Sequence, residues 1–168
     1  SFLKRALKNI NRLEVLVTDL VDISRIETGE LTMNIIQVNI IPIIEELVKD
    51  ANEGKDKKDL KIYISNNTKN NINVDADPDR IHQVFDNLLS NAIRYTDDGE
   101  IEIAINSEAG KVNFSIRDTG IGMDDESIER IFERFYRTLT ARSRVKSGTG
   151  LGLSIVKHII EAHGSNIE

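Results

Sequence analysis

Apolar residues recur near the start of the chain at the spacing of an amphipathic helix. The steps between them alternate between four and three residues, which predicts one long helix over residues 2–28. This apolar stripe consists of Ala6, Ile10, Leu13, Val17 and Leu20. A stripe of this kind can pack within its own domain or against a partner helix. Its persistence along the helix favours the partner.

In the remaining chain, some segments have apolar residues at the spacing of a strand and others have them at the spacing of a helix. Strands are predicted at residues 31–40, 60–65, 101–105 and 112–116. The last two strands flank a glycine-containing connection, which is typical of an antiparallel hairpin. Helices are predicted at residues 42–52, 78–95 and 151–162, with a short helical piece after residue 124.

The helix over residues 78–95 has the clearest local signals. Asp77 is a good N-cap residue, and Pro78 suits the first helical position. The apolar face of this helix is expected to consist of Ile81, Val84, Phe85, Leu88 and Ala92. Helices interleaved with a hairpin predict an α+β fold, with a mostly antiparallel or mixed sheet covered by helices on one face.

Composition and charge narrow the class of protein. Of the 168 residues, 39% are hydrophobic and 30% are charged, which suits a folded soluble protein better than a disordered one. The net charge of −6 argues against general nucleic-acid binding. The chain has no cysteine, which excludes disulfides, thiolate metal sites and a cysteine nucleophile. No apolar run is long enough to span a membrane.

Three polar residues of the helix over residues 78–95 fall on one side of it. Asn87, Asn91 and Arg94 lie close together around the helix axis, beside the apolar face. Amide oxygens suit Mg²⁺, which often keeps phosphate oxygens in its coordination shell, and arginine neutralises phosphate charge. A solvated polar face is the alternative interpretation.

Two glycine-rich stretches flank a basic segment. Asp118 ends a predicted strand, where its carboxylate can accept a hydrogen bond from the exocyclic amine of adenine, while Gly120 and Gly122 let the backbone turn against the ring. The second stretch, "GTGLGL", precedes a helix whose N-terminal N–H groups can bind phosphate. It lacks the Lys-Ser/Thr ending of the phosphate loop and the context of the dinucleotide fingerprint. Each stretch alone is a weak motif.

The segment between the two glycine stretches contains "IFERFYR", followed by Arg142, Arg144 and Lys146. One interpretation is a solvated loop with Phe132 and Phe135 in the core. The other is a lid whose aromatic residues anchor its base and whose cations face phosphates when it closes.

Four stretches occur in the chain in a diagnostic order: "NLLSNAIRYT", "DTGIGM", "IFERFYR" and "GTGLGLSIVK". Together they closely resemble the asparagine, first glycine, phenylalanine and second glycine boxes of sensor histidine kinases. The N-terminal "RLEVLVTDLVDISRIETG" is similar to the second helix of that family's dimerisation and phosphotransfer domain. The resemblance covers nearly the whole chain. It implies the two-layer α/β sandwich shared with gyrase B and heat-shock chaperone ATPases, preceded by one long helix.

The resemblance implies a role for each matching residue. Asn91, assisted by Asn87, would coordinate the Mg²⁺ of MgATP, and Arg94 would contact phosphate. Tyr95 would lie against the adenine or ribose. The residues implied to bind the base are Asp118, Gly120 and Gly122, and those at the lid hinge and phosphate end are Gly148, Gly150, Leu151 and Gly152. Arg137 would steady the terminal phosphate, so Asn91 and Arg137 are the implied catalytic residues.

The reaction implied is transfer of the ATP γ-phosphate to a histidine and then to an aspartate of a response regulator. The chain's His82, His158 and His163 do not lie in the His-Glu-Leu-Arg-like context of the family's acceptor, so we interpret them as structural or surface residues. The chain is therefore expected to begin after the acceptor histidine and to end before the last strands of the domain. Residues 1–29 would form part of the dimerisation domain, and residues 30–168 the ATP-binding domain.

The resemblance also implies partners and a location. The whole protein would form a homodimer through its N-terminal helix and act in the cytoplasm, with or without a membrane anchor elsewhere. No membrane contact is expected of this part. Two alternatives remain: an ATP hydrolase of the same fold, for which Asp86 is the nearest carboxylate, and a dimerisation and signal-relay module without catalysis.

Overall fold

The computed structural model describes residues 2–54, 59–66, 71–144 and 148–168. These residues form two compact units. One unit comprises Asn34–Asp124, and the other combines Ser1–Met33 with Asp125–Glu168. In the described ranges, no helix is both long enough and apolar enough to cross a lipid bilayer.

The unit Asn34–Asp124 contains a three-stranded sheet and a separate pair of short strands. Its elements are β1 (Ile36–Asn39), α2 (Ile40–Gly54), β2 (Leu60–Asn66), β3 (Asn73–Ala76), α3 (Pro78–Tyr95), β4 (Gly99–Glu108) and β5 (Lys111–Asp118). β1 and β3 pair antiparallel. In the larger sheet, β4 is central, parallel to β2 and antiparallel to β5. This mixed sheet confirms the predicted fold class.

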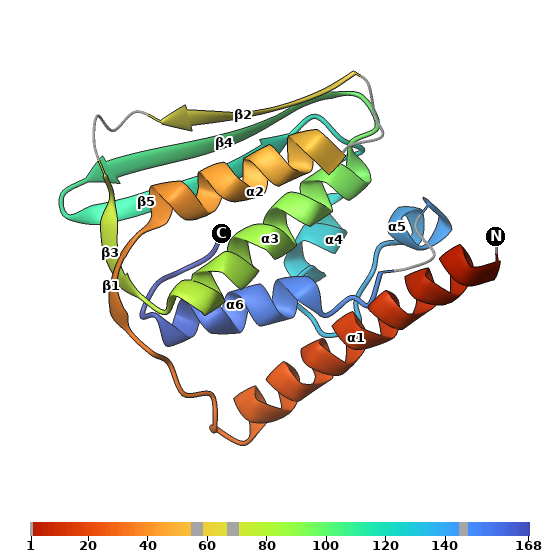
Figure 1. Ribbon diagram of the computed structural model, residues 1–168, viewed down its shortest axis with the longest axis horizontal. Coiled ribbons are helices and arrows are strands. Elements are labelled where there is room, and N and C mark those ends of the chain that lie inside the picture. Colours follow the sequence, from red (N-terminus) through yellow and green to blue (C-terminus); the bar gives the residue numbers. More distant parts are fainter. Residues whose placement is uncertain (1, 55–58, 67–70, 145–147) are drawn as a thin grey trace. The chain divides into compact units, whose positions relative to one another are not determined.

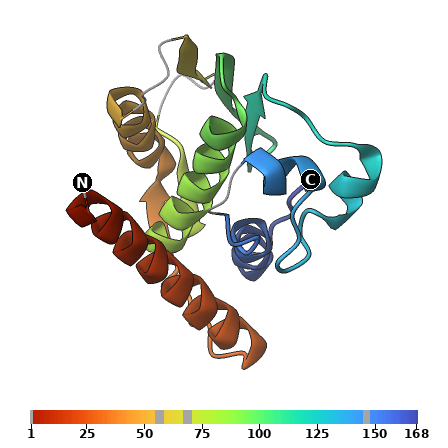
Figure 2. The ribbon, with the colours of Figure 1, turned by 90° about the vertical axis from the view of Figure 1, so that its right-hand side faces the viewer.

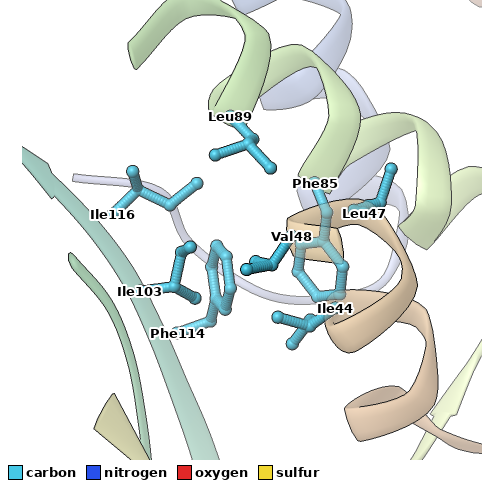
Figure 3. Close-up of a pocket in the computed structure, with 8 residues that line it drawn as sticks. All are labelled: Ile44, Leu47, Val48, Phe85, Leu89, Ile103, Phe114 and Ile116. Atoms are coloured by element: carbon cyan, nitrogen blue, oxygen red, sulfur yellow. The ribbon is translucent and has the colours of Figure 1, made fainter. Parts of the chain in front are cut away.

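Alternating isoleucines of β4 supply the centre of this unit. Ile101, Ile103 and Ile105 are almost completely buried, because every second side chain of a strand points to the same face. α2 and α3 lie side by side over one face of the sheet (Figure 1). Phe85 of α3 meets Phe114 of β5, with ring centroids 4.3 Å apart. The cavity left between these layers is lined only by apolar side chains (Figure 3).

Asp77 fixes the start of α3, as its capping pattern predicts. Its Oδ1 accepts hydrogen bonds from the backbone N–H groups of Asp79 and Arg80, at 3.1 and 3.2 Å. Its Oδ2 accepts from the N–H of Asn34 at 2.8 Å. One carboxylate therefore caps α3 and also holds the segment that leads into β1.

Asp77→Ala is expected to lower the free energy of unfolding by about 1–2 kcal/mol near neutral pH, because the first turn of α3 loses its cap. Burial raises the pKa of Asp77, but the N–H groups of Asn34, Arg80 and Asp79 together outweigh burial and hold that pKa below its ordinary value. The stabilisation by the charged carboxylate is therefore complete above the unfolded-state pKa of about 3.9, and it is lost as pH falls through the lower folded-state pKa. Urea unfolding of both proteins checks this: a stability gap that stays constant under acid conditions would contradict it.

The other unit is helical. It contains α1 (Phe2–Glu27), α4 (Asp125–Arg130), α5 (Leu139–Arg144) and α6 (Gly152–Ala162). α1 is one unbroken helix, as predicted, and it packs against α6 (Figure 2). The face of α1 that is buried includes Asp19, Asp22 and Ile23. The predicted stripe lies elsewhere on the helix: Ile10, Leu13, Val17 and Leu20 are each at least half exposed.

Several predicted boundaries were wrong. The strand expected over residues 31–40 is confined to Ile36–Asn39, and Ile40 already begins α2. The short elements β3 and α5 were not predicted. On α3 the buried apolar residue is Leu89, whereas the expected Leu88 is only half-buried.

Candidate functional site

The C-terminal half of α3 carries the amide side chains singled out in the sequence. Asn87 and Asn91 are half-buried and lie one turn apart, so they share one side of the helix. Arg94 is exposed in the last turn. Ala92 is buried, which fixes the rotation of this part of α3. The polar side predicted from the periodicity is therefore present.

The turn after β5 is built directly against the end of α3. Oδ1 of Asp118 accepts a hydrogen bond from the N–H of Gly120 at 2.9 Å, which closes a tight turn around Thr119. The carbonyl of Tyr95 accepts from the N–H of Ile121 at 3.2 Å. The structure therefore brings Tyr95 against Asp118 and Gly120, although Tyr95 lies more than 20 residues before them in the sequence.

Gly120 is required by this close approach. A Cβ atom at this position would lie 2.5 Å from the carbonyl oxygen of Tyr95 and 2.7 Å from Oδ1 of Asp118. No side chain fits between the turn and the helix. Gly122 follows on the exposed side of the turn. The backbone thus passes beside an exposed carboxylate, an arrangement that suits a flat ring read by Asp118.

In the helical unit, the phenylalanine stretch (residues 131–137) and the second glycine stretch (residues 148–153) meet through their backbones. The N–H of Phe135 donates to the carbonyl of Gly150 at 2.9 Å. Gly150 has a φ of +76°, and a Cβ there would lie 2.8 Å from the carbonyl carbon of Phe135. Leu151 is fully buried, and Gly152 begins α6. The two ends of the segment between these stretches are therefore closed against each other.

Arg137 lies beside this closed base. Its guanidinium donates to the carbonyl of Ala141 at 2.7 Å, and a Cβ at Gly148 would lie 3.2–3.4 Å from the guanidinium atoms. The structure thus groups Arg137, Gly148 and Gly150 in one unit, and Asn91, Tyr95 and Asp118 in the other. Of the three basic residues expected in the lid, Arg142 is exposed, while the side chain of Arg144 and all of Lys146 lie outside the described residues.

Phe135 is not an anchor in the core. The residue is 61% exposed, and its backbone, which pairs with Gly150, has a φ of +61°. Phe132 is half-buried, and the ammonium group of Lys157 lies 5.5 Å from its ring centre. The sequence pattern did not distinguish these two aromatic residues.

The donor set fits magnesium held together with phosphate. In the described part of the chain, no three histidine, cysteine or acidic side chains gather into a metal site. The amide oxygens of Asn87 and Asn91 are the candidate ligands, and Mg²⁺ commonly uses few protein ligands when phosphates supply the others. The apolar cavity of Figure 3 measures about 10 Å³, far below the hundreds of Å³ of a ligand pocket.

Sequence reasoning missed a polar contact between α1 and the second glycine stretch. The hydroxyl of Thr149 lies 3.2 Å from Oδ2 of Asp19. Asp19 is buried, and burial raises its pKa, as does the nearby charge of Asp22, while the hydrogen bond from Thr149 opposes the shift. A threonine whose hydroxyl accepts from the N–H two residues later is a weak local turn signal, but no local pattern identifies a partner 130 residues away.

Known proteins are similar to this chain in sequence and in fold. The chain is 34% identical over 169 residues to the sensor histidine kinase WalK of Bacillus subtilis, covering 99% of this chain and 27% of WalK. It spans 27–40% of the length of three such curated relatives. The full-length ShkA structure, in complex with AMPPNP, has a TM-score of 0.78 at 26% identity, covering 95% of this chain and 33% of that one.

A second solved structure is the histidine kinase ThkA in complex with the response regulator protein TrrA. It has a TM-score of 0.74 at 28% identity, and the match covers 95% of this chain and 43% of that one. Residues 76–168, more than half of the chain, match the family described as histidine kinase-, DNA gyrase B- and HSP90-like ATPases. The chain belongs to this ATPase family.

Proposed function

We propose that this chain is the ATP-binding catalytic part of a sensor histidine kinase, which transfers the γ-phosphate of ATP to a histidine on a separate helix. The observation that carries the proposal is the turn Asp118–Gly120 held against the last turn of α3. This contact joins the candidate purine reader to the helix that bears Asn87 and Asn91. The turn itself uses only Oδ1 of Asp118, which leaves Oδ2 of the exposed carboxylate for the adenine amine.

Each residue of this unit receives one role. Asp118 accepts from the exocyclic amine of adenine, while Gly120 and Gly122 line the base. Tyr95 lies against the adenine or ribose. Asn91 and Asn87 would hold Mg²⁺, and Arg94 would contact phosphate. A bound metal would neutralise negative charge on the phosphate oxygens.

The helical unit supplies the remaining residues. Gly148, Gly150, Leu151 and Gly152 form the phosphate end, because they lead into the N-terminus of α6, where N–H groups are available to oxygen anions. Arg137 steadies the terminal phosphate. Catalysis by these groups is mostly positioning and charge stabilisation, as in other phosphoryl transfers.

The same proposal extends to partners. The AMPPNP bound to ShkA supports an adenine nucleotide as ligand, and the ThkA complex with TrrA supports a response regulator as the next phosphate acceptor. The exposed stripe of α1, including Ile10 and Leu13, supports a homodimer of the whole protein through residues 1–29, with residues 30–168 as the ATP-binding domain. We place this domain in the cytoplasm, where ATP and response regulators are found.

The test is phosphate transfer from radiolabelled MgATP, with and without a separate acceptor helix that carries a histidine. We expect acid-labile label on the acceptor only when both chains are present. Asn91→Ala, which removes the proposed metal ligand, should abolish the label. Steady release of phosphate without any acceptor would favour the ATP hydrolase, and it would place Asp86, exposed on α3, as the candidate base.

A further inference from the structure

α1 contacts the second glycine stretch through a directed chain of hydrogen bonds. The N–H of Leu151 donates to Oγ1 of Thr149 at 3.1 Å. An N–H group cannot accept, so the hydroxyl oxygen is the acceptor there. The single proton of the hydroxyl is then available to Oδ2 of Asp19, 3.2 Å away. The carboxylate on α1 therefore orients the hydroxyl that holds the N-terminus of α6.

A second polar contact joins α1 to the residues that follow α4. Glu27 forms an ion pair with Arg134, which lies in the phenylalanine stretch. Both side chains are partly exposed, so this pair adds little stability by itself. The ion pair instead provides a second point of attachment on α1, because Glu27 lies eight residues after Asp19, about 12 Å further along the helix.

These two contacts bracket one segment of the chain. Arg134 precedes residues 135–148, and Thr149 follows them. The N–H of Phe135 and the carbonyl of Gly150 close the base of that segment. α1 thus touches both borders of the segment that contains Arg137 and Gly148.

Of the two contacts, the one made by Asp19 costs more free energy to break, because Asp19 is buried. The side chain of Asp19 is only 8% exposed, and a buried carboxylate is costly unless it is hydrogen-bonded. Losing the hydroxyl of Thr149 would leave one of its oxygens without that donor. A movement of α1 that separates the two groups is therefore opposed, and α1 and the glycine stretch should move together.

We propose that Asp19 is a positioning residue, which through Thr149 sets the conformation of the second glycine stretch, so that the position of α1 controls nucleotide affinity. The ion pair of Glu27 with Arg134 holds the residues that precede this segment against α1. This inference rests on the proposed function, in which the second glycine stretch binds the phosphate end of ATP. The pair Asp19–Thr149 is then a specific link between α1 and the nucleotide site.

The test uses Asp19→Ala and Thr149→Val with their double variant. Two quantities are measured: the dissociation constant for MgATP by calorimetry, and amide hydrogen exchange at residues 139–144 and 150–152 without nucleotide. Each single variant should weaken ATP binding by about tenfold, equivalent to about 1.4 kcal/mol, and speed exchange. The double variant should be no worse than either single variant, because both remove the same interaction.

Conservative variants separate positioning from general damage. Thr149→Ser keeps the hydroxyl and Asp19→Asn keeps an acceptor oxygen, so both should retain most of the affinity and the slow exchange. Glu14→Ala, on the exposed side of α1, is the matched control and should change nothing. Asp19→Asn also covers the case in which Asp19→Ala fails to fold.

Additive losses in the double variant would overturn the link, and so would loss of affinity in Thr149→Val with none in Asp19→Ala, which would make Thr149 a direct ligand. If the unmodified chain binds no ATP, the proposed function fails. The exchange data then decide the link alone: unchanged exchange in both single variants overturns it.

Discussion

Asp118→Asn should weaken ATP binding by about tenfold to a hundredfold, the loss expected when a hydrogen bond to a charged group in a binding site is removed. The reason lies in the two oxygens of the carboxylate. Oδ1 already accepts from the N–H of Gly120, and the adenine amine requires a second acceptor. An asparagine has one acceptor oxygen, so it would present an NH₂ group to one of the two donors.

The calorimetric titration of this variant needs two comparisons. Asp75→Asn removes a charge from an exposed position of β3 and should leave ATP affinity unchanged. The preference for ATP over GTP should also fall in Asp118→Asn, because guanine presents a carbonyl where adenine presents an amine. Unaltered selectivity would show that another group reads the purine.

Gly120→Ala should damage both the fold and the site. The added methyl group would overlap the carbonyl oxygen of Tyr95, 2.5 Å away, and this carbonyl belongs to the rigid last turn of α3. Relieving the overlap means separating the turn from the helix, with an expected cost of about 1–3 kcal/mol in unfolding free energy. Because the same movement displaces Asp118 from Tyr95, ATP affinity should fall as well.

Urea unfolding and ATP titration of Gly120→Ala check this prediction. Gly54→Ala is the matched control in the same unit, since a methyl group at Gly54 meets no atom within 4 Å and the φ there is not positive. It should leave stability and affinity nearly unchanged. Wild-type stability in Gly120→Ala would mean that the turn and α3 are not in the tight contact described here.

Local signals predicted the part of the fold that local interactions determine. The cap at Asp77 and the apolar period of α3 located that helix at both ends. The alternation in β4 and β5 predicted their hairpin. β3 is only four residues long and pairs with β1 more than 30 residues earlier, so its short sequence carries no strand signal of its own.

The candidate site divides in the same way. Sequence motifs identified Asn91, Asp118 and Gly120 as candidate site residues. The structure adds the contact of Tyr95 with the turn. The exposed Phe135 and the pair Asp19–Thr149 depend on backbone conformation and on contacts between distant segments. Such features arise from tertiary structure, and no short pattern encodes them.

The decisive experiment on Asp118 as the purine reader is a titration of the unmodified chain with ATP and with GTP, each in magnesium buffer. We expect saturable binding of ATP at one site and at least about tenfold weaker binding of GTP, because the site is built to accept a hydrogen bond from adenine. Equal affinities for the two nucleotides, or no binding of ATP at all, would contradict this assignment.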